Sequence, residues 1–174
     1  MKRILMAGSG GIIGREIGKY FINKYSVYNI NKSELKGSFQ LDLLNKEEID
    51  NFVKNSSQFD ILIFLVGLAH SKGKKADYSK FHDINYITLV NLLDSMNNLK
   101  KLPKQIIYTS SISVYGERMH KEIYDEESNL KPVSPYAKTK LNAEKYLLNN
   151  YKKRAWVLRL SPVYSKLFLL NIHR

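Results

Sequence analysis

The most informative segment of the chain is Gly8-Ser9-Gly10-Gly11-Ile12-Ile13-Gly14, which follows a predicted strand over Arg3–Ala7 and opens a predicted helix over Ile12–Lys24. In a strand-to-helix turn of this kind, the first glycine permits the tight turn and the second lets the backbone approach a diphosphate. The third lets the helix pack closely on the strand, and the start of the helix offers free N–H groups to the diphosphate. The loop predicts a dinucleotide site formed by Gly8, Gly11, Ile12, Ile13 and Gly14.

Short apolar runs alternate with longer helical patterns along the rest of the chain. Ile61–Val66 is the clearest strand, and Tyr78–Leu99 and Pro135–Tyr151 are predicted as long helices. Further strands are expected over residues 27–30, 39–41, 105–109 and 156–160, and a shorter helix is expected after an Asn45 N-cap. This alternation predicts an α/β fold of the Rossmann type, a doubly wound parallel sheet with helices on both faces.

The composition excludes several classes of protein. With 174 residues, 44% of them hydrophobic, the chain has the size of one globular domain. The absence of cysteine excludes a disulfide scaffold and a thiol nucleophile, and the four histidines are too scattered for a metal cluster. The net charge of +12 attracts anions, but the lysines are dispersed and no nucleic-acid motif accompanies them. The longest apolar run is too short to span a bilayer, so a cytoplasmic protein without a membrane or nucleic-acid partner is expected.

The residues after the second and third predicted strands bear on the choice between NAD and NADP. An acidic residue about 20 positions after the glycine loop usually accepts the ribose hydroxyls. This chain has Asn31 there, followed by Lys32. Asn31 can still hydrogen-bond a ribose hydroxyl, whereas Lys32 either meets a 2′-phosphate or is an ordinary surface lysine. Asp42, with Leu43 beside it, is predicted to reach the adenine edge, because its strand ends at the same edge of the sheet.

A tyrosine and a lysine four residues apart indicate acid–base chemistry. The segment Ser134-Pro135-Tyr136-Ala137-Lys138-Thr139-Lys140 opens a predicted helix and places Tyr136 and Lys140 on one face. A neighbouring ammonium favours the phenolate form of tyrosine, so the pair is a candidate general acid/base. This spacing alone is common in a chain with 12 tyrosines. Ser110 and Ser111 close the preceding strand, however, at the edge of the sheet where doubly wound folds bind ligands.

With these motifs in this order, the chain resembles the extended short-chain dehydrogenase/reductases, in particular the NAD-dependent epimerase/dehydratase branch that acts on nucleotide sugars. The resemblance covers residues 1–164. Besides the glycine loop and the Tyr136 helix, it rests on Phe64-Leu65-Val66-Gly67-Leu68-Ala69-His70, Asn85 with Asn91-Leu92-Leu93, Ser110-Ser111-Ile112-Ser113-Val114-Tyr115-Gly116 and Leu158-Arg159-Leu160-Ser161-Pro162-Val163-Tyr164.

The resemblance implies roles for individual residues. Tyr136 would be the acid/base, Lys140 would hold the nicotinamide ribose and lower the pKa of the tyrosine, and Ser111 would polarise the substrate oxygen. A loop or packing role is favoured over a catalytic one for His70. The other implied contacts of the cofactor site are Asn85 in the long helix, Val66 and Gly67 near the diphosphate, and Pro162 and Val163 near the nicotinamide carboxamide.

The resemblance also narrows the reaction. The dehydratases of the family place an Asp-Glu pair where this chain has Ile112 and Ser113, which cannot supply the acid and base that elimination of water needs. Epimerisation of a nucleotide sugar is therefore favoured, with hydride passing between a sugar carbon and NAD or NADP. The missing acid at Asn31 favours an NADP-dependent keto-sugar reductase as the alternative. A homodimer is compatible with the resemblance.

The chain is shorter than the resemblance implies. The expected dinucleotide-binding domain occupies residues 1–164, and residues 165–174 form an apolar tail. The sequence thus predicts an enzyme without its C-terminal substrate-binding region, which binds a dinucleotide with weak or no turnover. The competing hypothesis is a non-catalytic dinucleotide-binding module, against which the intact Ser111, Tyr136 and Lys140 argue.

Overall fold

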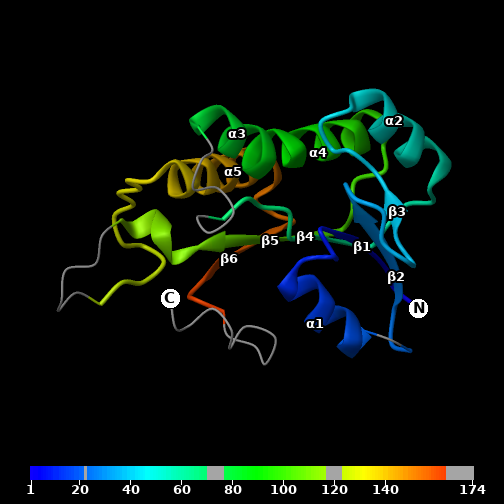
Figure 1. Cartoon of the computed structure of the whole chain (residues 1–174), viewed down its shortest axis with the longest axis horizontal. Helices are drawn as coiled ribbons and strands as arrows, with labels where there is room; N and C mark the ends of the chain where they lie inside the picture. The colour runs from blue at the N-terminus through cyan, green and yellow to red at the C-terminus, as the bar shows by residue number, and fades with distance from the viewer. Residues whose placement is uncertain (22, 70–76, 117–122, 164–174) are drawn as a thin grey trace.

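The computed structural model describes residues 1–21, 23–69, 77–116 and 123–163. Within these ranges the chain forms a six-stranded parallel sheet with the strand order β3-β2-β1-β4-β5-β6 (Figure 1). The order reverses between β1 and β4, and such a switch point is where doubly wound sheets bind ligands. The strands are β1 (Arg3–Ala7), β2 (Ser26–Asn31), β3 (Phe39–Gln40), β4 (Ile61–Phe64), β5 (Gln105–Ser111) and β6 (Ala155–Leu160).

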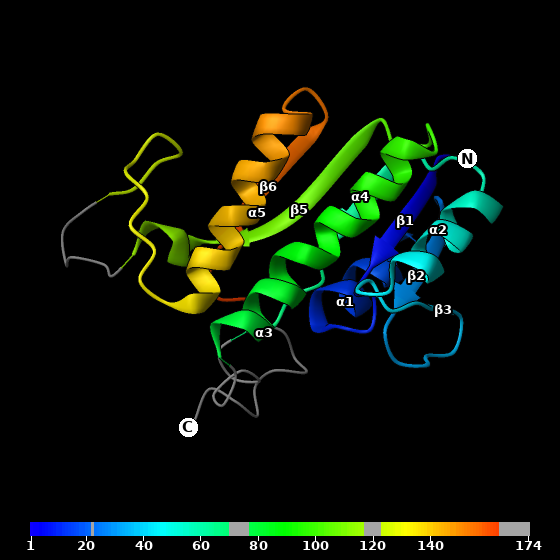
Figure 2. The ribbon, with the colours of Figure 1, turned by 90° about the horizontal axis from the view of Figure 1, so that it is seen from above.

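Helices lie on both faces of the sheet, as the sequence predicts. Figure 1 shows α1 below the sheet and the other four helices above it, and Figure 2 shows α4 and α5 side by side over the strands. The α/β architecture of the doubly wound type is therefore confirmed. The helices are α1 (Ile12–Phe21), α2 (Lys46–Asn55), α3 (Tyr78–His82), α4 (Thr88–Asn98) and α5 (Pro135–Tyr151).

The alternation of side chains along each strand builds two apolar cores. Leu5 and Ala7 of β1 face the larger core beneath α2, α4 and α5, whereas Ile4 and Met6 face α1. All four side chains are almost fully buried. Burial of Leu5, Ile4 and Met6 contributes about 1.5–3 kcal/mol for each side chain, and burial of the smaller Ala7 contributes less. A slip of one residue would exchange the two faces, so burial fixes the register and with it the positions of the strand ends.

Local capping sets the start of two helices. Asn45 caps α2 as predicted, because its side-chain oxygen accepts a hydrogen bond from the amide of Glu48 at 3.3 Å. Ser134 caps α5 by accepting a hydrogen bond from the amide of Ala137 at 3.1 Å, and Pro135 occupies the first turn. The second cap fixes the start of the helix that carries the predicted acid/base.

Several predicted boundaries differ from the structure. The first helix ends at Phe21 instead of Lys24, and Asn23 has a φ of 68°, a left-handed conformation that a helix cannot continue through. The fourth strand ends at Phe64, which leaves Val66 in the following loop. The long helix predicted from Tyr78 is interrupted by a π-helical turn over Asp83–Ile87, between α3 and α4.

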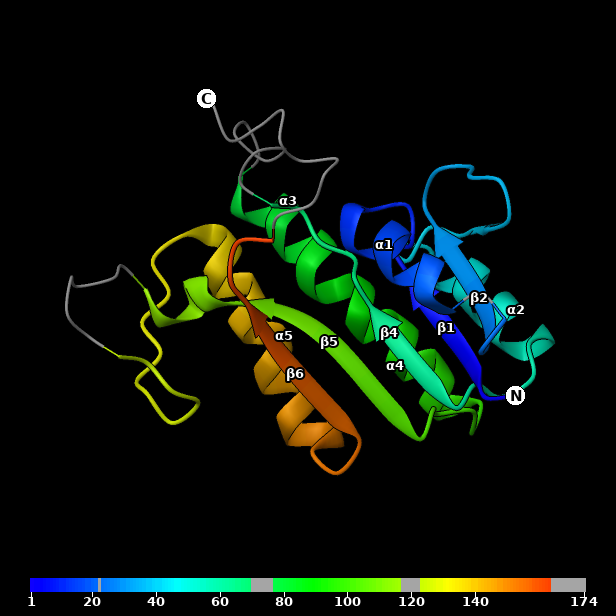
Figure 3. The ribbon, with the colours of Figure 1, turned by 90° about the horizontal axis from the view of Figure 1, so that it is seen from below.

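On the lower face of the sheet, few described residues pack against β6. Figure 3 shows α1 beneath the β1 side, away from β6. Trp156 and Leu158 of β6, whose side chains are 61% and 41% exposed, alternate with residues that face the larger core. The predicted apolar tail, residues 165–174, lies outside the described residues. No described helix combines the length and the apolarity needed to cross a membrane.

Candidate active site

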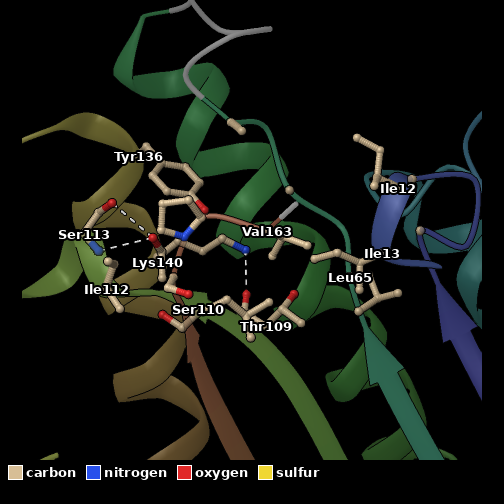
Figure 4. Close-up of a pocket in the computed structure, with 18 of the residues that line it drawn as sticks. Ile12, Ile13, Leu65, Thr109, Ser110, Ile112, Ser113, Tyr136, Lys140 and Val163 are labelled. Atoms are coloured by element: carbon tan, nitrogen blue, oxygen red, sulfur yellow. Dashed lines mark hydrogen bonds between the residues drawn. The ribbon is translucent and has the colours of Figure 1, made fainter. Parts of the chain in front are cut away.

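Two cavities open at the carboxyl edge of the sheet. The first, with a volume of about 570 Å³, lies between the glycine loop, the end of β5 and the start of α5 (Figure 4). The second, of about 410 Å³, lies between the glycine loop and the ends of β2 and β3. Gly8, Gly11, Leu65 and Gly67 line both cavities, so the two meet at the glycine loop. Cavities of this size are typical of small-molecule and cofactor sites.

The glycine loop is packed too tightly for side chains at its key positions. Gly8 has a φ of +83°, and a Cβ there would lie 3.0 Å from the backbone nitrogen of Val66. A Cβ on Gly14 would lie only 2.6 Å from the Cα atom of Ser9. Gly8 therefore serves the tight turn that the sequence predicts, whereas Gly14 lets the helix approach the backbone of the glycine loop at Ser9, and not the strand that the sequence predicts as its neighbour.

Asn31, at the end of β2, holds the glycine loop in place. Its Oδ1 accepts a hydrogen bond from the amide of Gly10, and its Nδ2 donates one to the hydroxyl of Ser9, each at 2.8 Å. The next residue, Lys32, forms an ion pair with Asp42, with 2.8 Å between Nζ and Oδ2. The hydrogen bond from Lys32 lowers the pKa of Asp42. A cation and a carboxylate thus lie side by side where the sequence predicts the adenosine.

The predicted catalytic residues come together at the first cavity. Ser111 ends β5, Tyr136 and Lys140 lie on successive turns of α5, and all three line the cavity. The hydroxyl of Ser111 donates a hydrogen bond to Oγ of Ser113 at 3.0 Å, and it also hydrogen-bonds Tyr136. Nζ of Lys140 donates to the carbonyl oxygen of Thr109 at 2.9 Å, a contact drawn in Figure 4. One side of the cavity therefore carries a hydroxyl, a phenol and an ammonium.

Burial shifts the pKa of both ionisable groups in this cavity. Burial lowers the pKa of Lys140 from its ordinary value of 10.5 to about 8, and the charge of Glu144 opposes that shift. Burial raises the pKa of Tyr136, and the hydrogen bond with Ser111 opposes the rise. The expected lowering of the tyrosine pKa by Lys140 is thus opposite in direction to the shift in this structure. Nζ of Lys140 is 6.0 Å from the centre of the Tyr136 ring, and the causes of the shift in the pKa of Tyr136 are burial and the hydrogen bond with Ser111.

Lys140→Met is expected to change how stability depends on pH. The pKa of Lys140 is about 8 in the folded chain against an ordinary value of 10.5, so the unfolded chain binds more protons between these pH values. The cost of the buried charge is present in full below pH 8 and is lost as the pH rises through this window. Relative to the variant, the wild type should gain roughly 3 kcal/mol of unfolding free energy from neutral pH to pH 10.5. Urea denaturation at a series of pH values measures this, and parallel curves would contradict it.

Nearly all predicted cofactor contacts line one of the two cavities. The first cavity is lined by Gly8, Gly11, Ile12, Ile13, Gly14, Gly67, Pro162 and Val163, and the second by Asn31, Lys32, Asp42, Leu43 and Val66. Asn85 lines neither cavity, because it is fully buried in the π-helical turn. Its Oδ1 accepts from the amide of Leu68 at 2.6 Å, and its Nδ2 donates to Oγ1 of Thr139 at 3.1 Å. Asn85 therefore supports the loop after β4 from behind instead of forming a cavity wall. His70 lies outside the described residues.

Several residues of the site have no signal in the sequence motifs. Thr109 holds Lys140 through its main-chain carbonyl, which no side-chain pattern can indicate. The second cavity is also lined by Lys80, Asp83 and Ile84, from α3 and the π-helical turn. The helical pattern predicts that this segment is partly buried, but its approach to the glycine loop depends on the packing of the whole sheet.

The positions that distinguish dehydratases also lie at the first cavity. Ile112 and Ser113 line it directly after Ser111, so this part of the wall carries an apolar side chain and a hydroxyl instead of two carboxylates. In the part of the chain that the structure describes, no three His, Cys, Asp or Glu side chains gather into a group that could hold a metal ion. The acid–base groups of the described cavity wall are therefore Tyr136 and Lys140.

Comparisons with curated proteins find sugar-modifying enzymes. The chain is 27% identical over 154 residues to the N-acetyl-alpha-D-glucosaminyl-diphospho-ditrans,octacis-undecaprenol 4-epimerase of Escherichia coli O157:H7, a match that covers 86% of this chain and 44% of that protein. It is 27% identical over 180 residues to the dTDP-D-glucose 4,6-dehydratase of Dictyostelium discoideum, which covers 87% of this chain and 41% of that protein. The chain thus spans less than half the length of these two relatives.

A solved structure and a family model also match this chain. The UDP-glucose 4-epimerase of Thermotoga maritima, solved with UDP-glucose, matches with a TM-score of 0.81 and 22% identity over 94% of this chain and 56% of that chain. This likeness shows a shared fold. The sequence model of the NAD dependent epimerase/dehydratase family matches residues 4–171. Because that match spans nearly the whole sequence, including the glycine loop, the serine strand end and the tyrosine–lysine helix, the chain belongs to the NAD dependent epimerase/dehydratase family.

Proposed function

We propose that residues 1–164 form the dinucleotide-binding and catalytic part of an NAD(P)-dependent nucleotide-sugar epimerase. The observation that carries the proposal is a single cavity lined by the glycine loop and by Ser111, Tyr136 and Lys140. The relatives are by name a 4-epimerase and a sugar dehydratase, which favours a nucleotide sugar as the substrate class. Because the match covers only 44% and 41% of these relatives, the activity of the whole protein is part of the proposal.

The residues present fit a nicotinamide dinucleotide. The two cavities extend from Asp42 to Tyr136 and meet at the glycine loop, as two nucleotides joined by a diphosphate require. A Cβ on Gly67 would lie 3.1 Å from Nζ of Lys140, so a side chain there would crowd this junction. The first amides of α1 have no acceptor within the helix and are free to receive the diphosphate. Asn31, Lys32 and Asp42 would hold the adenosine half, and Lys140 with Pro162 and Val163 the nicotinamide half.

Tyr136 and Ser111 are the residues to which we assign the proton transfer. Because their side chains are hydrogen-bonded, both can reach the same sugar oxygen. Tyr136 takes the proton of the sugar hydroxyl as that carbon is oxidised, and Ser111 donates a hydrogen bond to the resulting ketone oxygen. Burial raises the pKa of Tyr136, so its phenolate needs a nearby positive charge, which the buried ammonium of Lys140 supplies. When bound, the nicotinamide supplies a hydride acceptor and donor.

The chemistry of the cavity wall favours epimerisation over dehydration. An epimerase needs one acid/base, which removes the proton of a hydroxyl as hydride leaves the carbon and returns a proton to the ketone oxygen when hydride is added back to the opposite face of that carbon. Tyr136 meets that need without help from a second carboxylate. Elimination of water needs a further acid and base next to the sugar ring, and Ile112 and Ser113 supply neither.

Hydride transfer by the chain itself tests the proposal. The protein is loaded with NAD or NADP, mixed with UDP-sugars, and followed by the absorbance of reduced nicotinamide and by product analysis. Tyr136→Phe is measured in parallel. Transfer that the substitution removes supports the assignment, whereas transfer at an unchanged rate contradicts it. Cofactor binding without transfer in either protein would support the non-catalytic dinucleotide-binding module instead.

An NADP-dependent keto-sugar reductase is the second candidate, and Lys32 is the observation that favours it. Its side chain is 72% exposed beside the second cavity, and its ion pair with Asp42 holds the ammonium in place. Asn31 brings no carboxylate to repel a 2′-phosphate, and its amide is already hydrogen-bonded to the glycine loop. Lys32 thus offers a 2′-phosphate one cation, which is also paired with Asp42.

Lys32→Ala is expected to weaken binding of NADPH by about tenfold, the size of one charge-assisted hydrogen bond, and to leave the affinity for NADH almost unchanged. The fluorescence of the reduced nicotinamide measures both affinities. Lys36→Ala is the control, because it removes the same charge from an exposed position nearby that lines neither cavity. An equal loss of affinity for both cofactors would contradict a 2′-phosphate contact at Lys32.

A further inference from the structure

A buried ion pair lies behind the candidate active site. Glu144 of α5 is 1% exposed, and its carboxylate accepts hydrogen bonds from the hydroxyl of Ser110 and the guanidinium of Arg159. Nη2 and Nε of Arg159 lie 2.9 Å and 3.2 Å from Oε2 of Glu144. Several hydrogen bonds thus converge on one buried carboxylate and hold it in a defined orientation. Burying such a pair costs desolvation, so stability alone does not account for it.

Arg159 extends this network to residues beyond the end of β5. Its Nη1 donates to the hydroxyl of Tyr115 at 2.8 Å and to the carbonyl oxygen of Glu126 at 3.3 Å. Its guanidinium carbon also lies 5.0 Å from the centre of the Tyr115 ring. The pair of Glu144 and Arg159 therefore joins α5 and β6 to the end of β5 and to the short 3₁₀ turn that follows it. These segments surround the first cavity.

The same carboxylate faces the buried charge of Lys140. Lys140 and Glu144 are four residues apart on α5, hence neighbours on one helical face. Glu144 is the one described carboxylate whose charge opposes the desolvation of Lys140. The aromatic rings of Tyr108 and Tyr136 also lie near Lys140, with Nζ 4.8 Å and 6.0 Å from the ring centres, and Arg159 is hydrogen-bonded to the carboxylate of Glu144.

We propose that Glu144 is a positioning residue, whose buried carboxylate balances the charge of Lys140 and, through Ser110 and Arg159, fixes α5 against the end of β5. The effect of Glu144 on catalysis rests on the proposed function. The effect of its charge on Lys140 depends only on residues of this chain. Neither Glu144 nor Arg159 lines the first cavity, so both act through the residues that do.

Loss of the Glu144 carboxylate and loosening of the fold would shift the pKa of Lys140 in opposite directions. Without the charge of Glu144, the buried ammonium faces the cation of Arg159 uncompensated, so its charged form costs more and the pKa of Lys140 falls. If a substitution merely loosened the packing, water would reach the ammonium and its pKa would rise towards the ordinary value of 10.5. The direction of the shift therefore separates charge balance from packing.

An NMR titration of Lys140 in the full chain, without cofactor or sugar, measures this shift. The Cε resonance of Lys140 is assigned by its disappearance in Lys140→Met. Glu144→Gln keeps the shape of the side chain and is expected to lower the pKa of Lys140 by about one unit or more. Arg159→Gln removes the cation that competes for the carboxylate of Glu144. This substitution is expected to raise the pKa of Lys140.

Glu47→Gln serves as the control, because it removes an exposed carboxylate from α2 and should leave the pKa of Lys140 unchanged. Circular dichroism and a cooperative thermal transition establish that each variant is folded. An unchanged or raised pKa in folded Glu144→Gln overturns the proposal. If that variant does not fold, Arg159→Gln is compared with Arg159→Lys, which keeps the cation: a rise in the pKa of Lys140 in Arg159→Gln alone supports the proposal, and an unchanged or lowered pKa there, or an equal rise in both variants, overturns it. Since no cofactor or sugar is present, a failure of the proposed epimerase activity leaves this result intact.

Discussion

Tyr136→Phe is expected to lower the rate of hydride transfer by about 10²- to 10⁴-fold, the usual contribution of a positioned general acid/base. The substitution removes the phenolic oxygen that hydrogen-bonds Ser111 and keeps the aromatic ring in the wall of the first cavity. The affinity for NAD or NADP should stay close to that of the wild type, because the glycine loop and Lys140 are intact. Single-turnover absorbance measures the rate, and nicotinamide fluorescence measures the affinity.

Tyr20→Phe is the matched control for this prediction. Tyr20 lies on α1 with 73% of its side chain exposed, away from either cavity, so its loss of a hydroxyl should change neither the rate nor the affinity. The comparison uses the ratio of variant to wild-type rate, which does not depend on how fast the chain turns over by itself. A ratio near one for Tyr136→Phe would remove this residue from the reaction.

Gly14→Ala is expected to abolish dinucleotide binding at concentrations that saturate the wild type, and to lower the free energy of unfolding by about 1–3 kcal/mol. The new Cβ would lie 2.6 Å from both the Cα atom and the carbonyl oxygen of Ser9. Backbone atoms cannot move aside as a flexible side chain can, so the loop must shift. The hydrogen bonds from Gly10 and to Ser9 that hold the loop on Asn31 would then be strained or broken.

Gly18→Ala in the same helix provides the control for Gly14→Ala. A Cβ at Gly18 would meet nothing within 4 Å, so the substitution gains helix propensity without a clash. It should raise the free energy of unfolding by about 0.5–1 kcal/mol and leave cofactor binding unchanged. Urea denaturation and a binding titration of both variants measure the contrast. Equal behaviour of the two alanines would show that the loop is not packed against α1 as described.

The elements with strong local signals are the ones that the sequence predicts best. The bounds of β1 and α5 agree with the predictions, because glycines end the apolar run of β1 and Ser134-Pro135 caps α5. The first helix and the fourth strand end earlier than predicted, since their ends carry no equally strong signal. The π-helical turn over Asp83–Ile87 has no signal in a helical pattern, which predicts an uninterrupted helix.

For the candidate site, motif spacing predicts which residues belong together but not how they interact. Ser111, Tyr136 and Lys140 do line one cavity. The direction of the Tyr136 pKa shift differs from the prediction, because burial cannot be read from two residues four apart. Asn85 is a predicted cofactor contact whose hydrogen bonds instead support a loop. Glu144 has no place in the predicted site at all, although its carboxylate lies at the centre of the network behind it.

The amino-acid sequence is sufficient for the order of strands and helices, for the glycine loop and for the membership of the family, because these depend on local conformation and on motifs in a fixed order. The tertiary structure is needed for the two joined cavities, for the burial of Lys140 and for the contacts of Glu144. Ser110, Glu144 and Arg159 belong to three separate elements, and only the packing of α5 against β5 and β6 brings them within hydrogen-bonding distance. Charge balance at the site depends on distance and burial, which no linear motif encodes.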